Sequence, residues 1–237
     1  MPHFRTEALR EIGGWDPYNV TEDSDLGMRL ARFGYGAAVI ASTTYEEAPA
    51  RIGPWIRQRT RWFKGWMQTW LVHMRHPVRL ARELGVRGFL TFQLVVGGTV
   101  LSALVHPLFI ALFTYALATN RLFPSRDLAS VTLAALCGGA LIAGYVTSAA
   151  LGLIGLKRRG LLRHGFVLLL MPLHWLLLSI AAWRALWQLL RDPYRWEKTA
   201  HGLARTSRLA AFVGTARTKI TLRNGGADRR PRPRAAA

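Results

Sequence analysis

Three long apolar runs, at residues 89–119, 131–155 and 165–190, constrain this chain more than any other feature. A helix needs about 20 predominantly apolar residues to cross the hydrocarbon core of a bilayer, and each run is long enough. The chain is 51% hydrophobic, yet its formal net charge is +19, which is typical of a membrane protein with basic cytoplasmic flanks. A nucleic-acid-binding protein can be equally basic, but it would not carry three such runs. We therefore expect a multi-pass membrane protein that binds no nucleic acid.

The first run is too long for one straight span. Its 31 residues would reach roughly 46 Å at about 1.5 Å per residue, against a core of about 30 Å. Gly97-Gly98 and His106-Pro107 are natural break points, so we expect an interfacial helix that continues into a span near residues 104–119. The second run is predicted to cross the membrane. It carries small residues at intervals of four that favour close helix packing, namely Ala140, Gly144, Ser148 and Gly152.

The third run, residues 165–190, is predicted to be re-entrant or interfacial. A full crossing would place everything after it outside, whereas residues 191–237 are dense in Arg and Lys, which favours the cytoplasmic side. Pro172 and Arg184 also weaken a simple span. We expect the protein to lie in the cell (inner or plasma) membrane, with its N-terminal part and its C-terminus in the cytoplasm. Residues 191–237 then form a basic cytoplasmic segment with a disordered tail from Gly225.

Residues 1–50 alternate short helical and extended pieces, which indicates half of an α/β domain. We expect this half-domain at residues 1–77, ahead of a membrane region at residues 78–190. We expect helices at residues 4–11 and 22–33, the second ending at Gly34, with a turn at Gly13-Gly14 between them. A short apolar run at residues 37–41 is predicted to be a strand.

The tripeptide Thr21-Glu22-Asp23 begins the second of these helices. Thr21 is predicted to be the N-cap, with its hydroxyl accepting from a first-turn N–H, and the two acids suit the helix dipole. Leu26 and Leu30 follow Asp23 at offsets of three and seven and share its face. We therefore expect the Asp23 carboxylate to point inward.

A second group lies on the helix that begins near Pro54. Gln58, Arg61 and Trp62 stand at i, i+3 and i+4, so they share one face. A carboxylate base, a guanidinium and a flat aromatic ring suit a reaction that deprotonates a hydroxyl while a phosphate leaves beside a sugar ring.

Together, T-E-D at residues 21–23 and Q-x-x-R-W at residues 58–62 resemble the signature of inverting, membrane-embedded family-two glycosyltransferases of the cellulose synthase and hyaluronan synthase type. The flanks agree: Phe-Arg-Thr-Glu-Ala-Leu at 4–9, Gly-Gly-Trp at 13–15 and Arg-Phe-Gly at 32–34. The resemblance is close over residues 4–77 and loose over the membrane part. It implies a partial GT-A-type α/β domain followed by α-helical transmembrane and interfacial helices. It also implies a nucleotide-diphosphate sugar donor, Mg²⁺ or Mn²⁺, and a growing polysaccharide or glycan as acceptor.

The resemblance also assigns roles to single residues. Asp23 would be the general base and Glu22 would orient its neighbours beside Thr21. Arg61 would face the diphosphate, Trp62 would support a sugar face, and Gln58 would hydrogen-bond the sugar or the motif. Simpler alternatives are a helix-capping acid for Asp23, binding of lipid phosphate for Arg61 and a solvated polar side chain for Gln58. In cellulose synthase a gating loop follows the interfacial helix, and the residues at the corresponding place are Trp196, Lys198, Thr199 and His201.

The expected metal ligands are absent from this sequence. In the resembling family an upstream half binds the nucleotide-sugar and carries an Asp-x-Asp metal site, and no such motif precedes Thr21. No His or Cys spacing suits a metal either, so no metal is assigned to this chain. The sequence looks like the C-terminal part of an enzyme whose other half a separate chain could supply. A non-catalytic membrane remnant or partner subunit, and a structural protein bound to anionic lipid, remain open alternatives.

Overall fold

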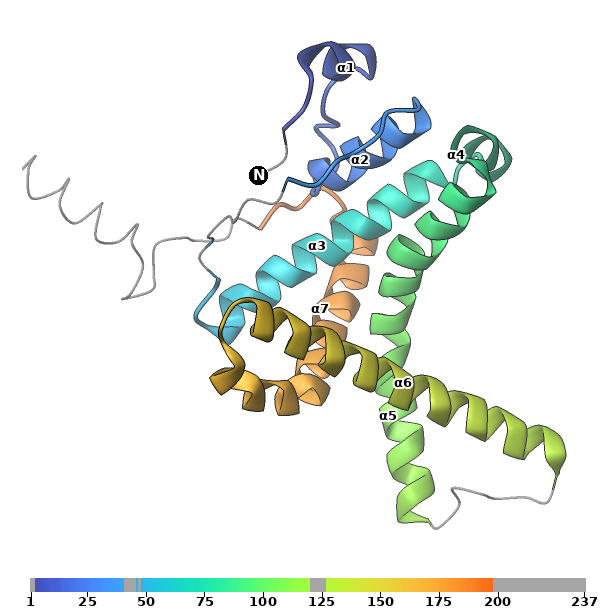
Figure 1. The fold of residues 1–237 in the computed structure, drawn as a ribbon. Coiled ribbons are helices and arrows are strands. Elements are labelled where there is room, and N and C mark those ends of the chain that lie inside the picture. Colours follow the sequence, from blue (N-terminus) through green and yellow to red (C-terminus); the bar gives the residue numbers. More distant parts are fainter. Residues whose placement is uncertain (1–2, 41–45, 47, 120–126, 198–237) are drawn as a thin grey trace, which may run out of the picture. The chain divides into compact units, whose positions relative to one another are not determined.

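The computed structural model describes residues 3–40, 46, 48–119 and 127–197, and it is built from helices (Figure 1). Pro2–Ala38 and Ile56–Glu197 form one compact unit, which holds every contact described below. In chain order the elements are α1 (Thr6–Glu11), α2 (Glu22–Arg32), α3 (Ile52–His73), α4 (Pro77–Phe92), η1 (Gln93–Gly97), α5 (Gly98–Ala118), α6 (Leu128–Arg158), η2 (Leu162–Leu170) and α7 (Met171–Arg191).

The predicted α/β domain is wrong, because the described part of the chain contains no strand. Residues 37–40, which we expected to form a strand, have no regular structure, and Ala41 lies outside the described residues. A strand needs a neighbour that accepts and donates its ladder hydrogen bonds. Val39 is fully exposed and Ile40 is 72% exposed, so this apolar run finds neither a strand partner nor a core.

The helices and turns ahead of this run match the sequence pattern closely. α1 is shorter than expected and begins at Thr6, whereas α2 ends at Arg32, one residue before the expected end. Gly13, Gly14 and Gly34 all have positive φ, between 74° and 82°, which a residue without a Cβ adopts at little cost. The predicted turn and the predicted helix stop are therefore confirmed.

α4, η1 and α5 follow one another without a gap over the 42 residues Pro77–Ala118, with a kink at Gly85 inside α4. The predicted break at Gly97-Gly98 corresponds to η1, a stretch of π-helix that ends at Gly97. The ring of Trp70 lies against Gly97, where an added Cβ would come within 2.9 Å of the indole nitrogen. The predicted break at Pro107 is wrong, because α5 continues through this residue.

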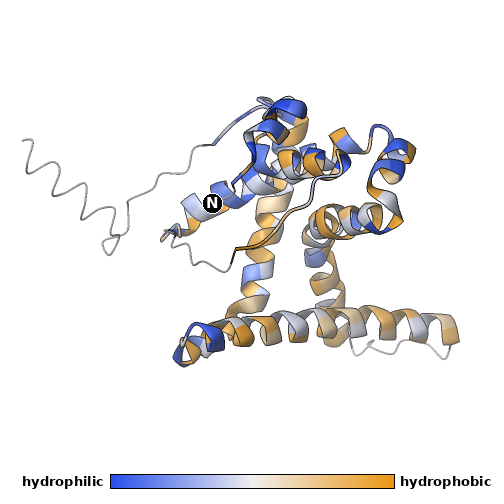
Figure 2. Cartoon of the chain, turned by 45° about the horizontal axis from the view of Figure 1, so that its top comes forward, coloured by the Kyte–Doolittle hydropathy of each residue, from blue (hydrophilic) through white to orange (hydrophobic). Residues whose placement is uncertain are grey.

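Three helical segments are long and apolar enough to cross a membrane: Pro77–Ala118, Leu128–Arg158 and Leu162–Arg191. Hydrophobic residues extend along most of these segments, whereas hydrophilic residues gather on α1 and α2 (Figure 2). α6 is the clearest case, since none of its residues is buried within the protein. Pro172 lies in the first turn of α7, where proline is well tolerated, so it begins this helix rather than weakening it.

The main apolar core lies where α3, α5 and α7 meet (Figure 1). Ala181, Ala182 and Ala185 of α7 are fully buried, and their small size lets α7 approach α5 and α3 closely. Phe63 and Met67 of α3 fill the opposite side of this contact. α3 is therefore held against the apolar helices by one face, which leaves its other faces to position the N-terminal segment.

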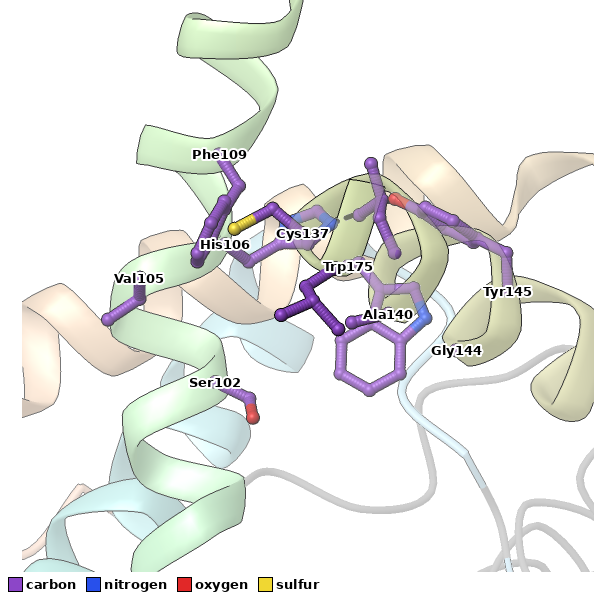
Figure 3. Close-up of a pocket in the computed structure, with 11 residues that line it drawn as sticks. Ser102, Val105, His106, Phe109, Cys137, Ala140, Gly144, Tyr145 and Trp175 are labelled. Atoms are coloured by element: carbon purple, nitrogen blue, oxygen red, sulfur yellow. Dashed lines mark hydrogen bonds between the residues drawn. The ribbon is translucent and has the colours of Figure 1, made fainter. Parts of the chain in front are cut away.

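A second apolar space, with a volume of about 420 Å³, lies between α5, α6 and the start of α7 (Figure 3). His106 of α5 and Tyr145 of α6 meet there, with 2.8 Å between the ring nitrogen Nε2 and the hydroxyl oxygen. The side chain of His106 therefore joins two helices that have few other contacts.

Candidate active site

α3 carries five buried polar side chains: Thr60, Lys64, Gln68, Thr69 and His73. The first three follow one another at intervals of four, and Thr69 and His73 form a second such pair on another side of the helix. Buried polar groups destabilise a fold unless they are hydrogen-bonded. Four of the five have protein partners, and all of these partners belong to segments far away in the sequence. These side chains therefore attach other parts of the chain to α3.

Gly65 brings the Thr21-Glu22-Asp23 tripeptide onto α3. A Cβ at position 65 would clash with the Thr21 side chain, so only glycine allows the start of α2 to come this close. Thr21 is buried and stands at the N-cap, but its hydroxyl makes no capping bond to the first turn. The predicted capping bond is therefore wrong. The hydroxyl instead lies 3.4 Å from Oδ1 of Asn19, which also accepts from the backbone N–H of Thr21 at 3.0 Å.

Gln68 joins two segments that are 173 residues apart in the sequence. Its Oε1 accepts from the backbone N–H of Val20 at 3.2 Å, and its Nε2 donates to the carbonyl oxygen of Pro193 at 2.9 Å. Next to it, Asn19 donates from Nδ2 to the hydroxyl of Thr69 at 2.9 Å. The segment just before Glu22 and the segment just after α7 are thus held against the same turn of α3.

Lys64 completes this attachment. It is fully buried, and its ammonium donates to the backbone carbonyls of Arg195 and Asp192, the latter at 3.5 Å. Burial lowers the pKa of Lys64, and the nearby carboxylates of Asp192 and Glu197 oppose that shift. Arg184 holds Glu197 through two hydrogen bonds of 2.7 and 2.6 Å, so the segment after α7 is fixed at both ends.

A buried ion-pair network anchors the far side of α2. His73 donates from Nε2 to Asp25 at 3.1 Å, and Arg29 donates from Nε to the same carboxylate at 2.8 Å. Arg32 in turn donates to Nδ1 of His73 at 3.0 Å. Burial alone would raise the pKa of Asp25, but the hydrogen bond from His73 and the charge of Arg29 together lower it below its usual value.

The acids of the tripeptide lie at the surface. We expected Asp23 to point inward, but both Glu22 and Asp23 are exposed, and Asp25 is the carboxylate that is buried. The offset of three to Leu26 was misleading because α2 turns Asp25 and Leu26 together toward α3 and α4. Oδ1 of Asp23 accepts from the backbone N–H of Ser24 at 2.9 Å, which leaves the carboxylate open to solvent.

The three predicted residues on α3 are half-buried and less closely joined. The guanidinium of Arg61 stacks over the ring of Trp196 at 5.9 Å, and its Nε has no hydrogen-bond partner within the described residues. Trp62 has the guanidinium of Arg59 over its ring at 4.2 Å. The side chain of Gln58 makes no hydrogen bond in the part of the chain that is described. Arg61 and Gly65 are one turn apart, so the face that carries Gln58, Arg61 and Trp62 continues toward Thr21.

A cleft of about 430 Å³ opens beside the tripeptide. Glu22 lines it, together with residues 15–20 on one side and Tyr194 and Trp196 on the other. Trp196, one of the four residues of the predicted gating loop, is therefore close to Glu22 and Arg61. The other three, Lys198, Thr199 and His201, lie outside the described residues.

The side chains that hold the site together, Asn19, Asp25, Lys64, Gln68 and His73, were not among the predicted residues. A signal for two of them was present, since Lys64 and Gln68 stand four residues apart among the aromatic and aliphatic residues of the second half of α3, a pattern unusual for a lipid-facing surface. Their partners, which are mostly backbone atoms of distant segments, leave no signal in the sequence.

No metal site fits the described residues. They contain no group of three or more His, Cys, Asp or Glu side chains that could hold a metal ion. Asp23 is exposed on its own, and the Asp25 carboxylate is already paired with His73 and Arg29.

Two curated proteins show what this chain is similar to. A probable glycosyltransferase of Bacillus subtilis, YdaM, is 36% identical over 63 residues, which cover 26% of this chain and 15% of that protein. The beta-monoglucosyldiacylglycerol synthase of Synechocystis is 30% identical over 93 residues, which cover 37% of this chain and 19% of that protein. The chain thus spans less than a fifth of the length of either relative in these matches.

No solved structure matches the chain. The family described as glycosyl transferase family group 2 matches it over residues 2–196, which include the tripeptide, the Gln58–Trp62 motif residues, the cleft and all three apolar segments. This match covers most of the sequence, and the chain therefore belongs to glycosyl transferase family group 2.

Proposed function

We propose that this chain supplies the acceptor-facing and membrane-channel part of an inverting sugar transfer. The donor is a nucleotide-diphosphate sugar, and the acceptor is a growing polysaccharide or glycan. Family membership supports the reaction class. The contact between Thr21 and Gly65 carries the proposal, because it joins the Thr21-Glu22-Asp23 tripeptide to the helix that holds Arg61 and Trp62.

In this reaction Asp23 is the general base. An acceptor hydroxyl gives its proton to the Asp23 carboxylate as the hydroxyl oxygen attacks the anomeric carbon. The bond from that carbon to the diphosphate oxygen breaks, and the nucleoside diphosphate leaves with the bonding electron pair. A single displacement inverts the anomeric centre and needs one base. The exposure of Asp23 supports this role, since an acceptor can reach the carboxylate without displacing a structural partner.

Arg61 is placed to receive the leaving diphosphate. Its guanidinium offers a planar set of donors, which suits phosphate oxygens better than the ammonium of lysine does. Stacking on Trp196 holds the guanidinium beside the cleft, and the Nε donor has no partner among the described residues. Glu22 lines the cleft, where it orients the acceptor.

The most direct test replaces Asp23 with Asn, which keeps the shape of the side chain and removes the base. We expect turnover to fall about 10²–10⁴-fold, whereas donor affinity changes little. The variant is expressed from its native locus, so that anything encoded beside it is present, and turnover is measured in isolated membranes. Asp127→Asn is the matched control, because Asp127 is also an exposed acid at a helix start and Asn caps a helix well.

Normal turnover in Asp23→Asn would reject Asp23 as the base and favour the alternative of a non-catalytic remnant or partner subunit. An equal loss in Asp127→Asn would show that the effect is structural.

We also propose that residues 192–197 lie on the same side of the membrane as the tripeptide, which the basic flanks place in the cytoplasm. Gln68 bonds to both Val20 and Pro193, so the two segments are neighbours. The chain between α3 and Asp192 must then cross the membrane an even number of times, although three segments are long enough to cross. One of them therefore stays on or within one leaflet, which agrees with the expectation for residues 165–190.

Impermeant thiol labelling of intact cells tests this topology in a Cys137→Ser background. We expect Asp127→Cys to be labelled from outside and Arg195→Cys to be protected until the cells are opened. Labelling of Arg195→Cys in intact cells would contradict the even number of crossings.

A further inference from the structure

We propose that the cleft beside the tripeptide is a binding site for a neutral sugar ring of the acceptor, held between two aromatic walls. This inference rests on the proposed function and adds the residues that recognise the acceptor. The residues that line the cleft and carry the inference are Trp15, Asp16, Tyr18, Glu22, Tyr194 and Trp196.

The aromatic rings of the cleft are unusually exposed. Trp15, Tyr18, Tyr194 and Trp196 are 52%, 70%, 66% and 58% exposed, although each presents a large apolar surface. They come from segments 173 or more residues apart in the sequence, and they meet where the rings of Tyr18 and Tyr194 contact edge to face at 5.8 Å. Four exposed rings around one opening form an apolar surface of the kind that binds a ligand.

The charges of the cleft select the class of ligand. Its lining includes two carboxylates, Asp16 and Glu22, and no Lys, Arg or His, in a chain whose net charge is +19. Two carboxylates in one cleft repel a nucleoside diphosphate or an anionic lipid head group. The hydroxyls of a neutral sugar instead donate hydrogen bonds to carboxylates, while its C–H faces pack on aromatic rings.

Lys64 and Gln68 act as positioning residues for the second aromatic wall. Lys64 donates to the carbonyls of Asp192 and Arg195, and Gln68 donates to that of Pro193, so the backbone on both sides of Tyr194 is fixed. The same Gln68 holds Val20 on the opposite wall. The width of the cleft is therefore set from α3, the helix that also carries Arg61 and Trp62.

The apolar cavity of Figure 3 is a separate feature. It lies beside Trp175, in the first turns of α7, whereas Tyr194 and Trp196 follow the end of this helix. The 17 residues between Trp175 and Asp192 correspond to about 25 Å along a helix. The lining of that cavity contains no carboxylate, so it offers no comparable set of acceptors for sugar hydroxyls.

Binding of cellotetraose, a neutral β-linked oligosaccharide, to the purified chain tests the inference. The chain is placed in lipid nanodiscs, because maltoside detergents would themselves present sugar rings. We expect Trp196→Ala and Tyr18→Ala each to weaken binding by roughly tenfold, with partial recovery in Trp196→Phe. The matched control is Phe33→Ala, which removes an exposed ring at the C-cap of α2, outside the cleft. Thermal unfolding and gel filtration show whether each variant is folded.

The outcomes separate this inference from the proposed function. Wild-type binding in both alanine variants, or no binding by the unaltered chain, would overturn the sugar site even if Asp23→Asn still abolishes turnover. Uridine diphosphate that competes with cellotetraose and is itself weakened by Tyr18→Ala would overturn it too, since this variant keeps the contact between Trp196 and Arg61 and the cleft itself would then bind the donor. Loss of binding in the cleft variants with normal turnover in Asp23→Asn would keep the sugar site and reject the base.

Discussion

α3 and α6 are both long helices, but they differ in the side chains that they bury and expose. α3 buries five polar side chains, including a lysine, within the protein. α6 has a longer apolar sequence and buries nothing, so its leucines and valines remain on the surface. Apolar residues on the outside are stable where the surroundings are lipid, and polar residues on the inside are stable where each finds a partner.

The two helices differ in how strictly their sequences are constrained. α6 needs only length and composition, and many sequences satisfy both. α3 needs particular residues at particular positions. Gly65 makes room for Thr21, and Lys64 and Gln68 bind backbone atoms of distant segments. We therefore expect substitutions in the contacts of α3 to affect folding of the site, whereas substitutions in α6 affect insertion into the membrane.

The largest effect on stability is expected at Asp25, the buried partner of α3. Asp25→Ala leaves His73 and the partly buried Arg29 without their shared carboxylate, which typically costs about 3–5 kcal/mol of folding free energy. Thermal unfolding in nanodiscs measures the loss. A change no larger than that of Asp127→Ala, at the exposed start of α6, would contradict the anchoring role of the pair.

The same pair predicts the acid sensitivity of the N-terminal part. Because the pKa of Asp25 is lower in the folded state than its ordinary value of about 3.9, its stabilising effect is fully present above that value. It is lost as the pH falls through the lower folded value, since the carboxylate must then be protonated. Asp25→Asn should therefore show a weaker decline in unfolding temperature between about pH 5 and pH 2 than the unaltered chain.

A charge placed on α6 tests the other half of the comparison. Ile142 is exposed near the middle of α6, and Ile142→Arg should cost about 2.5–3.5 kcal/mol of insertion free energy if lipid surrounds it. The measurement is the fraction of chain that resists alkaline extraction from membranes. Ile40→Arg, at an exposed apolar residue outside the three segments, is the control. Equal extraction of both variants would mean that α6 is not in contact with lipid.

The smallest effects come from a pair of glycines, one in each helix. Gly65→Ala places a methyl group against Thr21 and should cost about 1–3 kcal/mol, together with loss of turnover. Gly144→Ala meets nothing within 4 Å in the described structure and should be neutral or stabilise α6 by up to about 1 kcal/mol. Unfolding temperatures of the two variants should therefore move in opposite directions. A loss at both positions would remove the distinction between the helices.

Much of the helical structure could be predicted from the sequence, because its signals are local. The glycines at positions 13, 14 and 34 predicted the turn and the end of α2, and the three apolar runs predicted the three long segments. Two local signals were misleading. Pro107 did not end α5, and the apolar run at residues 37–41 did not form a strand over the residues described, since no strand beside it is present there.

The positions of the predicted site residues could be predicted only in part from their spacing in the sequence. Asp23 is exposed, although the pattern of Leu26 and Leu30 predicted that it would point inward. Trp196 does lie beside Glu22 and Arg61, but no sequence pattern predicted that these residues would be neighbours. The sequence motif predicts which residues form the site, and their packing decides which atoms are open to a ligand.

The sequence by itself determined the family, the apolar segments, the turn at Gly13-Gly14 and the end of α2, because these depend on motif residues, composition and backbone preferences that act over a few residues. Only the tertiary structure decided that Asp25 rather than Asp23 is buried, that Thr21 docks on Gly65, and that the segment after α7 returns to α3. The physical reason is that Lys64 and Gln68 bind backbone carbonyls and an N–H, which every residue carries. Partners of that kind become specific only once the chain has folded.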